Sequence, residues 1–362
     1  MPDLIHTILA KIEKQCKAIK KGFDVPAFIL SENDDRYAGT RMATGSPKID
    51  GLLHGGFPCG KVVEIFGGEA SGKTTTCLTM IAGAQRASKN VIVVFIDAEH
   101  ALDVDYAVRI GIDPARIVIQ QPDYGEQALE LVKQACLAKL SDPALATSQL
   151  IIVVDSVAAL VPKCEFEAEQ IDGSGGMASQ AQMMSQAMRQ IIGPISNANA
   201  CAVFVNQTRE MMNSKAHTTP GGRALKFYSA LRLKMARIEK WEIGDGNKCQ
   251  MEVAKSKLFP PFKKTTFHIG PNGIDNWIGL VEEGCELKVI TKKGSWLKLG
   301  ETSIGQGIIK ARDYIKANPE AAQEVVNGIA AAHAAGVKPI ATAAPAPPPD
   351  GDLEADKELM AG

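Results

Sequence analysis

A glycine-rich segment followed by lysine and threonine carries the clearest chemical signal in the chain. Gly67-Gly68-Glu69-Ala70-Ser71-Gly72-Lys73-Thr74 fits the pattern G-x-x-x-x-G-K-[ST], with a β-branched run before it and an apolar stretch of helical spacing after it. The backbone N–H groups of such a loop and the N-terminus of the next helix bind phosphate. Lys73 adds a mobile charge, and the Thr74 hydroxyl suits Mg²⁺. The pattern predicts a nucleoside triphosphate site.

An aspartate at the end of a later apolar run is a candidate partner for that site. The run 150–154 ends in Asp155, so a buried strand delivers one carboxylate to its carboxyl end. Opposite a phosphate-binding loop, this carboxylate is expected to complete the Mg²⁺ shell, usually through water. The alternative is an aspartate that caps a turn with Ser156.

A second strand end carries a candidate general base. The run 91–96 is followed by Asp97-Ala98-Glu99-His100. From this position Glu99 can orient and deprotonate a water that attacks the γ-phosphate. We expect Asp97 to be structural and His100 to form or pack in a turn, because no cysteine or second histidine stands beside it.

Gln207 closes the apolar run 201–206. A side-chain amide at this strand end could hydrogen-bond the γ-phosphate and move when that phosphate leaves. On spacing alone, a glutamine at a strand end is more often an ordinary polar surface residue.

The elements that must position these residues alternate between strand and helix. Four short β-branched runs predict parallel strands, and four segments of helical spacing separate or follow them; the strands are 91–96, 116–120, 150–154 and 201–205, and the helices are 75–87, 102–111, 125–140 and 178–198. The repetition predicts a doubly wound α/β fold with ligands at the carboxyl ends of the strands. Later segments (229–237, 249–255 and 262–269) are expected to extend the sheet as antiparallel strands.

Composition narrows the class of protein. Hydrophobic residues make up 45% and charged residues 22% of 362 residues, as in ordinary globular proteins. The net charge of −1 gives no overall argument for nucleic acid, so such binding must depend on local features. The eight cysteines form no C-x-x-C pair, and no apolar run reaches membrane-spanning length, which indicates reduced thiols and a cytoplasmic protein.

Four parts are predicted along the chain. Residues 1–40 contain a helix with an apolar stripe and a linker; the stripe packs either on the chain's own core or on a neighbouring subunit. Residues 41–278 form an ATPase core, and 279–333 form a small α+β domain with helices at 306–317 and 319–333. Residues 334–362 are rich in Ala and Pro and then acidic, which predicts disorder.

Taken together, the motifs resemble those of bacterial-type RecA-family recombinases. The blocks that carry the resemblance lie within about residues 40–310; they are Val63-Glu64-Ile65 with Gly67 to Thr75, Asp97 to Asp103, Gln121-Pro122-Asp123 with Gly125 to Glu130, Val153 to Leu160, Met183 to Arg189, Asn206-Gln207, and Gly221-Gly222 with Ala224 to Tyr228. The resemblance implies a P-loop RecA-like fold and a DNA-dependent ATPase. It also implies helical filaments on single-stranded DNA, which pair it with homologous duplex DNA in recombination, repair and the SOS response.

The resemblance also assigns roles to single residues. Glu99 matches the water-activating glutamate, and Gln207 matches the residue that couples the γ-phosphate to the second DNA-binding loop. The loop 67–75 matches the ATP contacts, with Asp103 and Tyr106 on the adenine side. Lys255 and Lys257 match the pair that reaches the neighbouring subunit's ATP, and Phe227 matches an interface residue; Ser185, Arg189 and Arg209, with Gly221 and Gly222 at the end of the second loop, match DNA-binding positions.

Departures from the family pattern lie in the DNA loops. The first loop has the centre Gly173-Ser174-Gly175-Gly176 without a His-Met pair, Gln182 stands where an Arg precedes the Met pair, and the second loop is short. These differences bear on strand exchange and on co-protease action toward a repressor substrate. A filament-forming accessory protein that exchanges strands poorly is therefore the alternative function, and a small-molecule P-loop kinase is a third.

Overall fold

The computed structural model describes residues 40–168, 177–210, 217–241 and 246–334. The predicted N-terminal helix, the centre of the first DNA loop, residues 211–216 of the second DNA loop and the acidic tail lie outside the described residues. The division of the chain at residues 40, 278 and 333 stays a prediction.

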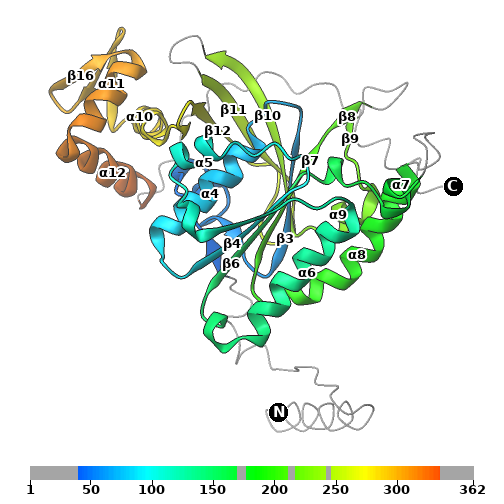
Figure 1. The fold of residues 1–362 in the computed structure, drawn as a ribbon. Coiled ribbons are helices and arrows are strands. Elements are labelled where there is room, and N and C mark those ends of the chain that lie inside the picture. The colour runs from blue at the N-terminus through cyan, green and yellow to red at the C-terminus, as the bar shows by residue number, and fades with distance from the viewer. Residues whose placement is uncertain (1–39, 169–176, 211–216, 242–245, 335–362) are drawn as a thin grey trace, which may run out of the picture. The chain divides into compact units, whose positions relative to one another are not determined.

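A mostly parallel sheet forms the centre of the molecule (Figure 1). Its spatial order is β13-β12-β11-β10-β3-β7-β6-β4-β5. The strands are β3 (Lys61–Gly67), β4 (Val91–Asp97), β5 (Ile117–Gln120), β6 (Gln149–Asp155), β7 (Cys201–Gln207), β10 (Leu231–Trp241), β11 (Gly246–Ser256), β12 (Lys264–Gly270) and β13 (Gly273–Ile274). The predicted α/β fold class is confirmed.

Among the late strands, the direction of one differs from the sequence prediction. β11 and β12 pair antiparallel to their predecessors, as expected, and so does β13, a short strand that the sequence did not predict. β10, in contrast, runs parallel to β3, with Leu231 opposite Val63. The helix α9 (Gly222–Tyr228) lies between β7 and β10 and returns the chain to the start of β3. Because a crossover of this kind joins strands of the same direction, β10 continues the parallel part of the sheet.

Helices cover both faces of the sheet (Figure 1). α4 (Lys73–Ala87) and α5 (Val104–Ile110) lie on one face, and α6 (Gly125–Ser141), α8 (Met177–Asn197) and α9 lie on the other. Alternate residues of a strand serve opposite faces: Ile151 and Val153 join the core under α4, whereas Ile152 and Val154 join the core under α6 and α8. The apolar runs of β6 and β7 are therefore buried on both sides, whereas Val118 and Ile119 of the edge strand β5 are exposed.

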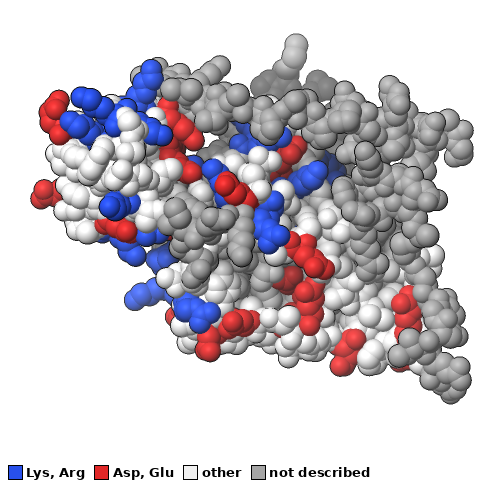
Figure 2. Space-filling view, turned by 90° about the horizontal axis from the view of Figure 1, so that it is seen from above, with Lys and Arg blue, Asp and Glu red and all other residues white. Residues whose placement is uncertain are grey.

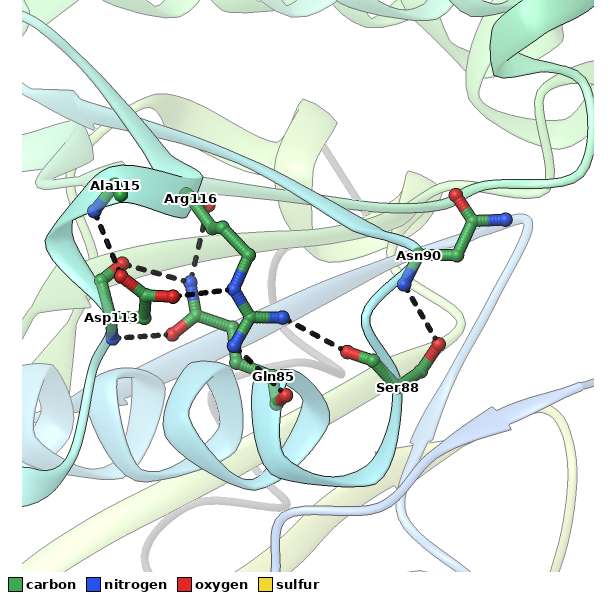
Figure 3. Close-up of polar contacts among 6 residues, drawn as sticks. All are labelled: Gln85, Ser88, Asn90, Asp113, Ala115 and Arg116. Atoms are coloured by element: carbon green, nitrogen blue, oxygen red, sulfur yellow. Dashed lines mark hydrogen bonds and ion pairs between the residues drawn. The ribbon is translucent and has the colours of Figure 1, made fainter.

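A polar network fixes the far end of the phosphate-loop helix α4 (Figure 3). The Arg116 guanidinium donates to the carbonyl oxygens of Gln85 (3.0 Å) and Ser88 (3.1 Å), and to the Asp113 carboxylate (2.7 Å). The Gln85 side chain in turn accepts from the Asp113 N–H at 2.8 Å. A cation on the last carbonyls of a helix is favourable, so Arg116 anchors the end of α4 to the segment before β5.

Shorter elements complete the core. They are β1 (Arg41–Met42), α3 (Pro47–Leu52), β2 (Phe57–Pro58), the 3-10 turns η2 (Pro114–Arg116), η3 (Pro143–Leu145) and η4 (Val157–Ala159), α7 (Lys163–Phe166), β8 (Arg209–Glu210) and β9 (His217–Thr218). Among the described residues, no helix is long and apolar enough to cross a bilayer.

A separate apolar cluster organises the C-terminal part. It is built from α10 (Asn276–Glu286), β14 (Ile290–Lys293), β15 (Trp296–Leu299), β16 (Thr302–Gln306), α11 (Gly307–Ala317) and α12 (Pro319–Ala334). The carboxylate of Glu282 on α10 accepts from Lys48 Nζ of α3 at 2.7 Å and lies 2.9 Å from His268 Nε2 of β12. Burial alone would raise the pKa of Glu282, but the His268 hydrogen bond and the Lys48 charge outweigh it and hold the pKa at about 2.

Candidate nucleotide-binding and DNA-binding site

The phosphate-binding loop joins β3 directly to α4. At two positions of this loop only glycine fits, because a side chain would clash with neighbouring atoms or strain the backbone. A Cβ on Gly67 would lie 2.1 Å from the Met235 carbonyl oxygen, and Gly72 has φ +86° with an Ile269 methyl group 2.2 Å from its Cβ position. The loop backbone can therefore approach a ligand closely, and Gly72 begins α4 without a side chain at its N-terminus.

Lys73 is the buried cation of this loop. Its ammonium group donates to the carbonyl oxygens of Gly67 (3.1 Å) and Gly68 (2.7 Å). Burial lowers the pKa of Lys73, and the nearby carboxylates of Asp155 and Glu99 oppose this effect. Ser71 Oγ donates to the Gly68 oxygen at 2.8 Å, which closes the loop on itself.

Thr74 and Asp155, both predicted to bind Mg²⁺, lie together at the carboxyl end of the sheet. Thr74 Oγ1 donates to Asp155 Oδ2 at 2.6 Å. Burial raises the pKa of Asp155 to about 6; the bond from Thr74 opposes the rise, and the charge of Glu99 adds to it. A hydroxyl and a carboxylate oxygen at this spacing have the donor chemistry that Mg²⁺ prefers.

The candidate base Glu99 meets Gln207 across the sheet. Gln207 Nε2 at the end of β7 donates to Glu99 Oε1 at 3.1 Å, and Ser156 Oγ donates to the same oxygen. The Glu99 side chain itself is exposed. Sequence reasoning treated Ser156 only as a turn partner of Asp155; its place one residue beyond the strand end was the available signal for a role in orienting Glu99.

Asp97, two residues before Glu99, binds backbone N–H groups. Its carboxylate accepts from the N–H groups of Ala101 and Leu102, both at 3.2 Å, and from Gln121 Nε2 at 3.1 Å. His100 is exposed and has φ +54°, so it lies in a left-handed turn. The geometry agrees with the structural interpretation of both residues.

The residues matched to the adenine side lie beside the first turn of α4. Tyr106 Oη is 3.2 Å from Thr75 Oγ1, and the Asp103 carboxylate caps α5 by accepting from the Tyr106 N–H at 2.9 Å. The Arg109 guanidinium lies 5.7 Å from the centre of the Tyr106 ring. Local caps thus fix the ring next to the phosphate-binding loop.

Lys255 and Lys257 lie at the end of β11. In the sheet order, β11 is on the other side of β3 from β7 and β4, which carry Gln207 and lead to Glu99. Lys255 Nζ donates to the Lys226 oxygen at 2.5 Å, and Lys257 Nζ donates to the Phe227 oxygen at 2.9 Å, so both hold the end of α9. Burial, followed by the neighbouring cations, lowers the pKa of Lys255. Among the described residues, no hydrogen bond or ion pair joins either lysine to Glu99 or to the phosphate-binding loop. The Phe227 side chain is 66% exposed.

The residues matched to DNA contacts flank the two loops. Ser185 and Arg189 share one face of α8, and the Arg189 side chain is exposed. Gly221 and Gly222, with φ +84° and +70°, begin α9 against α8. The backbone of Arg209 lies in β8, and its side chain is outside the described residues.

One polar residue that the sequence analysis did not single out joins α8 and the end of the second loop to the turn η4, which follows β6. Gln180 on α8 donates to the carbonyl oxygens of Val157 and Leu160, each at 3.0 Å, and accepts from the Gly221 N–H at 3.3 Å. Met183, Met184 and Met188 of the same helix are buried in the core.

Comparisons with known proteins agree with the geometry. A family model described as the RecA N-terminal domain matches residues 10–274, and one described as the RecA C-terminal domain matches 279–334. Protein RecA of Clostridium botulinum (strain Alaska E43 / Type E3) is 41% identical over 333 residues, which cover 90% of each chain. Protein RecA of Clostridium tetani is 43% identical over 80% of this chain and 81% of its own. Protein RecA of Symbiobacterium thermophilum is 42% identical over 89% of both.

Proposed function

The chain belongs to the RecA family of recombinases, DNA-dependent ATPases of recombination and repair, and we propose that each of its ATP sites is completed by the next subunit of a filament. One observation carries the proposal. Lys73, Thr74, Asp155, Glu99 and Gln207 converge at one end of the sheet, whereas Lys255 and Lys257 hold α9 elsewhere in the same chain.

Nucleotide binding uses the loop and the oxygen pair. Bound ATP would supply the phosphoryl group that passes to water, and Mg²⁺ would supply positive charge that offsets the phosphates. Lys73 exchanges its two neutral carbonyl partners for phosphate oxygens, a stronger, charge-assisted contact. Thr74 and Asp155 would hold the metal ion, and Tyr106 with Asp103 would border the base.

Glu99 takes a proton from the attacking water. The described hydrogen bonds to its carboxylate, from Ser156 and Gln207, both reach Oε1, so we assign the proton to Oε2. When the γ-phosphate draws the Gln207 amide away, the Ser156 hydroxyl still fixes the orientation of the carboxylate, which a general base requires for efficient proton transfer.

Gln207 links hydrolysis to DNA. Its amide binds Glu99 here, and it is the last residue of β7, from which the second DNA loop begins. A γ-phosphate that competes for this amide would shift the residue that starts the loop. In this way ATP strengthens DNA binding, and hydrolysis weakens it.

We expect DNA binding to depend on a local surface rather than on the charge of the whole molecule. Lys and Arg side chains are interspersed with Asp and Glu on the described surface in Figure 2, in keeping with the net charge of −1. We assign single-stranded DNA to the two loops with Ser185, Arg189, Arg209, Gly221 and Gly222, and homologous duplex DNA to the filament so formed. The protein acts where the DNA is, in the cytoplasm.

DNA stimulation of ATP hydrolysis tests this function. We expect single-stranded DNA to raise the hydrolysis rate and the filament to exchange strands with homologous duplex. Stimulated hydrolysis without strand exchange would favour the accessory filament protein, for which the altered DNA loops argue. Hydrolysis that DNA leaves unchanged would contradict the proposal and favour a small-molecule kinase.

A further inference from the structure

A buried carboxylate lies in the strand that leads into the phosphate-binding loop. Glu64 is on β3, three residues before Gly67, and its side chain is fully buried. A buried charge is costly unless it is paired and hydrogen-bonded. The nucleotide chemistry above does not use Glu64, so its retention in an otherwise apolar strand calls for another role.

Glu64 is bonded on both sides of its strand. Oε1 accepts from Asn206 Nδ2 of β7 at 3.0 Å, and Oε2 accepts from Arg232 Nε of β10 at 2.5 Å. The Arg232 guanidinium also lies over the Phe66 ring, 4.4 Å from its centre. The carboxylate therefore ties together the two strands that flank the phosphate-loop strand.

On the β7 side, these bonds continue to the nucleotide and the second DNA loop. Asn206 Oδ1 accepts from the Gln207 N–H at 3.0 Å, and Gln207 reaches Glu99 through its side chain. Asn206 Nδ2 donates also to the Pro220 oxygen at 3.1 Å, where the second loop returns to α9. Asn206 thus holds both ends of that loop, and Glu64 fixes Asn206.

On the β10 side, the partner of this carboxylate lies next to the lysine pair, because Arg232 stands opposite Lys255 where β10 pairs with β11. Both Arg232 and Glu64 lie close enough to Lys255 to act on its charge, Arg232 as a like charge and Glu64 as an opposite one. Lys255 and Lys257 bind the last carbonyls of α9, whose first residue is Gly222. Glu64 is therefore the junction between the γ-phosphate side of a subunit and the side that carries the lysines.

We propose that Glu64 is a positioning residue that couples the γ-phosphate sensor Gln207 and the second DNA loop to Lys255 and Lys257 through Asn206 and Arg232. The proposal rests on the function proposed above, because it needs a nucleotide at each end of the junction. A rigid, charge-paired junction transmits a shift of Asn206 to Arg232, whereas a neutral one leaves the two strands to move separately.

The test compares Glu64→Gln with the unchanged protein and with two controls. Glu252→Gln makes the same substitution on β11, where Glu252 pairs weakly with Lys264 at 3.8 Å. Gln207→Ala removes the sensor itself. For each protein we would measure ATP affinity without DNA and single-stranded DNA affinity with and without ATP. We expect Glu64→Gln to keep ATP affinity within about twofold and to lose about fivefold or more of the ATP-dependent gain in DNA affinity.

A purely structural role predicts a different pattern. Arg232→Gln combined with Glu64→Gln removes both charges, so that no partly buried cation is left without its partner. If Glu64 only stabilises the sheet, this pair restores both the melting temperature and the ATP-dependent gain, and the proposal is overturned. If Glu64 is a positioning residue, the double variant recovers the melting temperature but not the ATP-dependent gain in DNA affinity.

The controls separate two failures. A full gain in Glu64→Gln with a lost gain in Gln207→Ala would overturn the role of Glu64 and leave the proposed function standing. A full gain in both variants would overturn both. The Glu252→Gln control is expected to behave like the unchanged protein.

Discussion

Replacing Glu282 by Gln should destabilise the junction between α10 and the large sheet in a pH-dependent way. The magnitude follows from the pKa of Glu282, which lies at about 2 instead of the ordinary 4.5. Since one pKa unit corresponds to about 1.4 kcal/mol, the ionised carboxylate contributes roughly 3 kcal/mol to the free energy of unfolding near neutral pH. Gln keeps the shape of the side chain but loses the charge opposite Lys48.

The sign of the pH dependence is fixed by the lowered pKa. The contribution is complete above pH 4.5, where the carboxyl group of the unfolded chain is ionised, and it is lost as the pH falls from 4.5 through about 2. The stabilities of wild type and Glu282→Gln should therefore differ most near pH 7 and converge toward pH 2.

Urea unfolding followed by tryptophan fluorescence measures this difference. Trp277 and Trp296 both lie in the C-terminal part of the chain and report on it. A loss of roughly 3 kcal/mol lowers the urea midpoint by about 1–3 M at pH 7. Glu301→Gln, at an exposed position beyond β15, serves as the matched control and should not move the midpoint. Parallel pH profiles for wild type and Glu282→Gln would refute the reasoning.

Three further predictions concern the nucleotide site and DNA. Lys73→Ala should abolish tight ATP binding, whereas Glu99→Gln should keep it and slow hydrolysis by roughly a hundredfold or more; normal turnover by Glu99→Gln would show that another group is the base. Changing Lys255 and Lys257 to Ala should reduce cooperative ATPase but spare nucleotide binding by monomers, and mixing this variant with Glu99→Gln should recover partial activity. No recovery in well-mixed filaments would count against a shared site. Arg209→Ala should weaken binding to all DNA sequences alike and lower the slope of log affinity against log salt by about one, as a salt titration would reveal.

The sequence alone determined the parts that depend on short-range pattern. The phosphate-binding loop, Asp155 and Glu99 could be located because each follows a β-branched run, and parallel strands bring their carboxyl ends to one edge. The contact of Gln207 with Glu99 and that of Thr74 with Asp155 follow from this rule. Family motifs added Tyr106 and the lysine pair, whose roles no local pattern indicates.

Only the tertiary structure decided which distant side chains meet. The direction of β10 depended on the crossover through α9, which strand propensity does not specify. Glu64 reads in the sequence as one polar residue in an apolar strand, and its partners Arg232 and Asn206 lie 168 and 142 residues away along the chain. A buried charge is tolerated only where such partners reach it, and their arrival is set by sheet order and register, which the packing of the whole core determines.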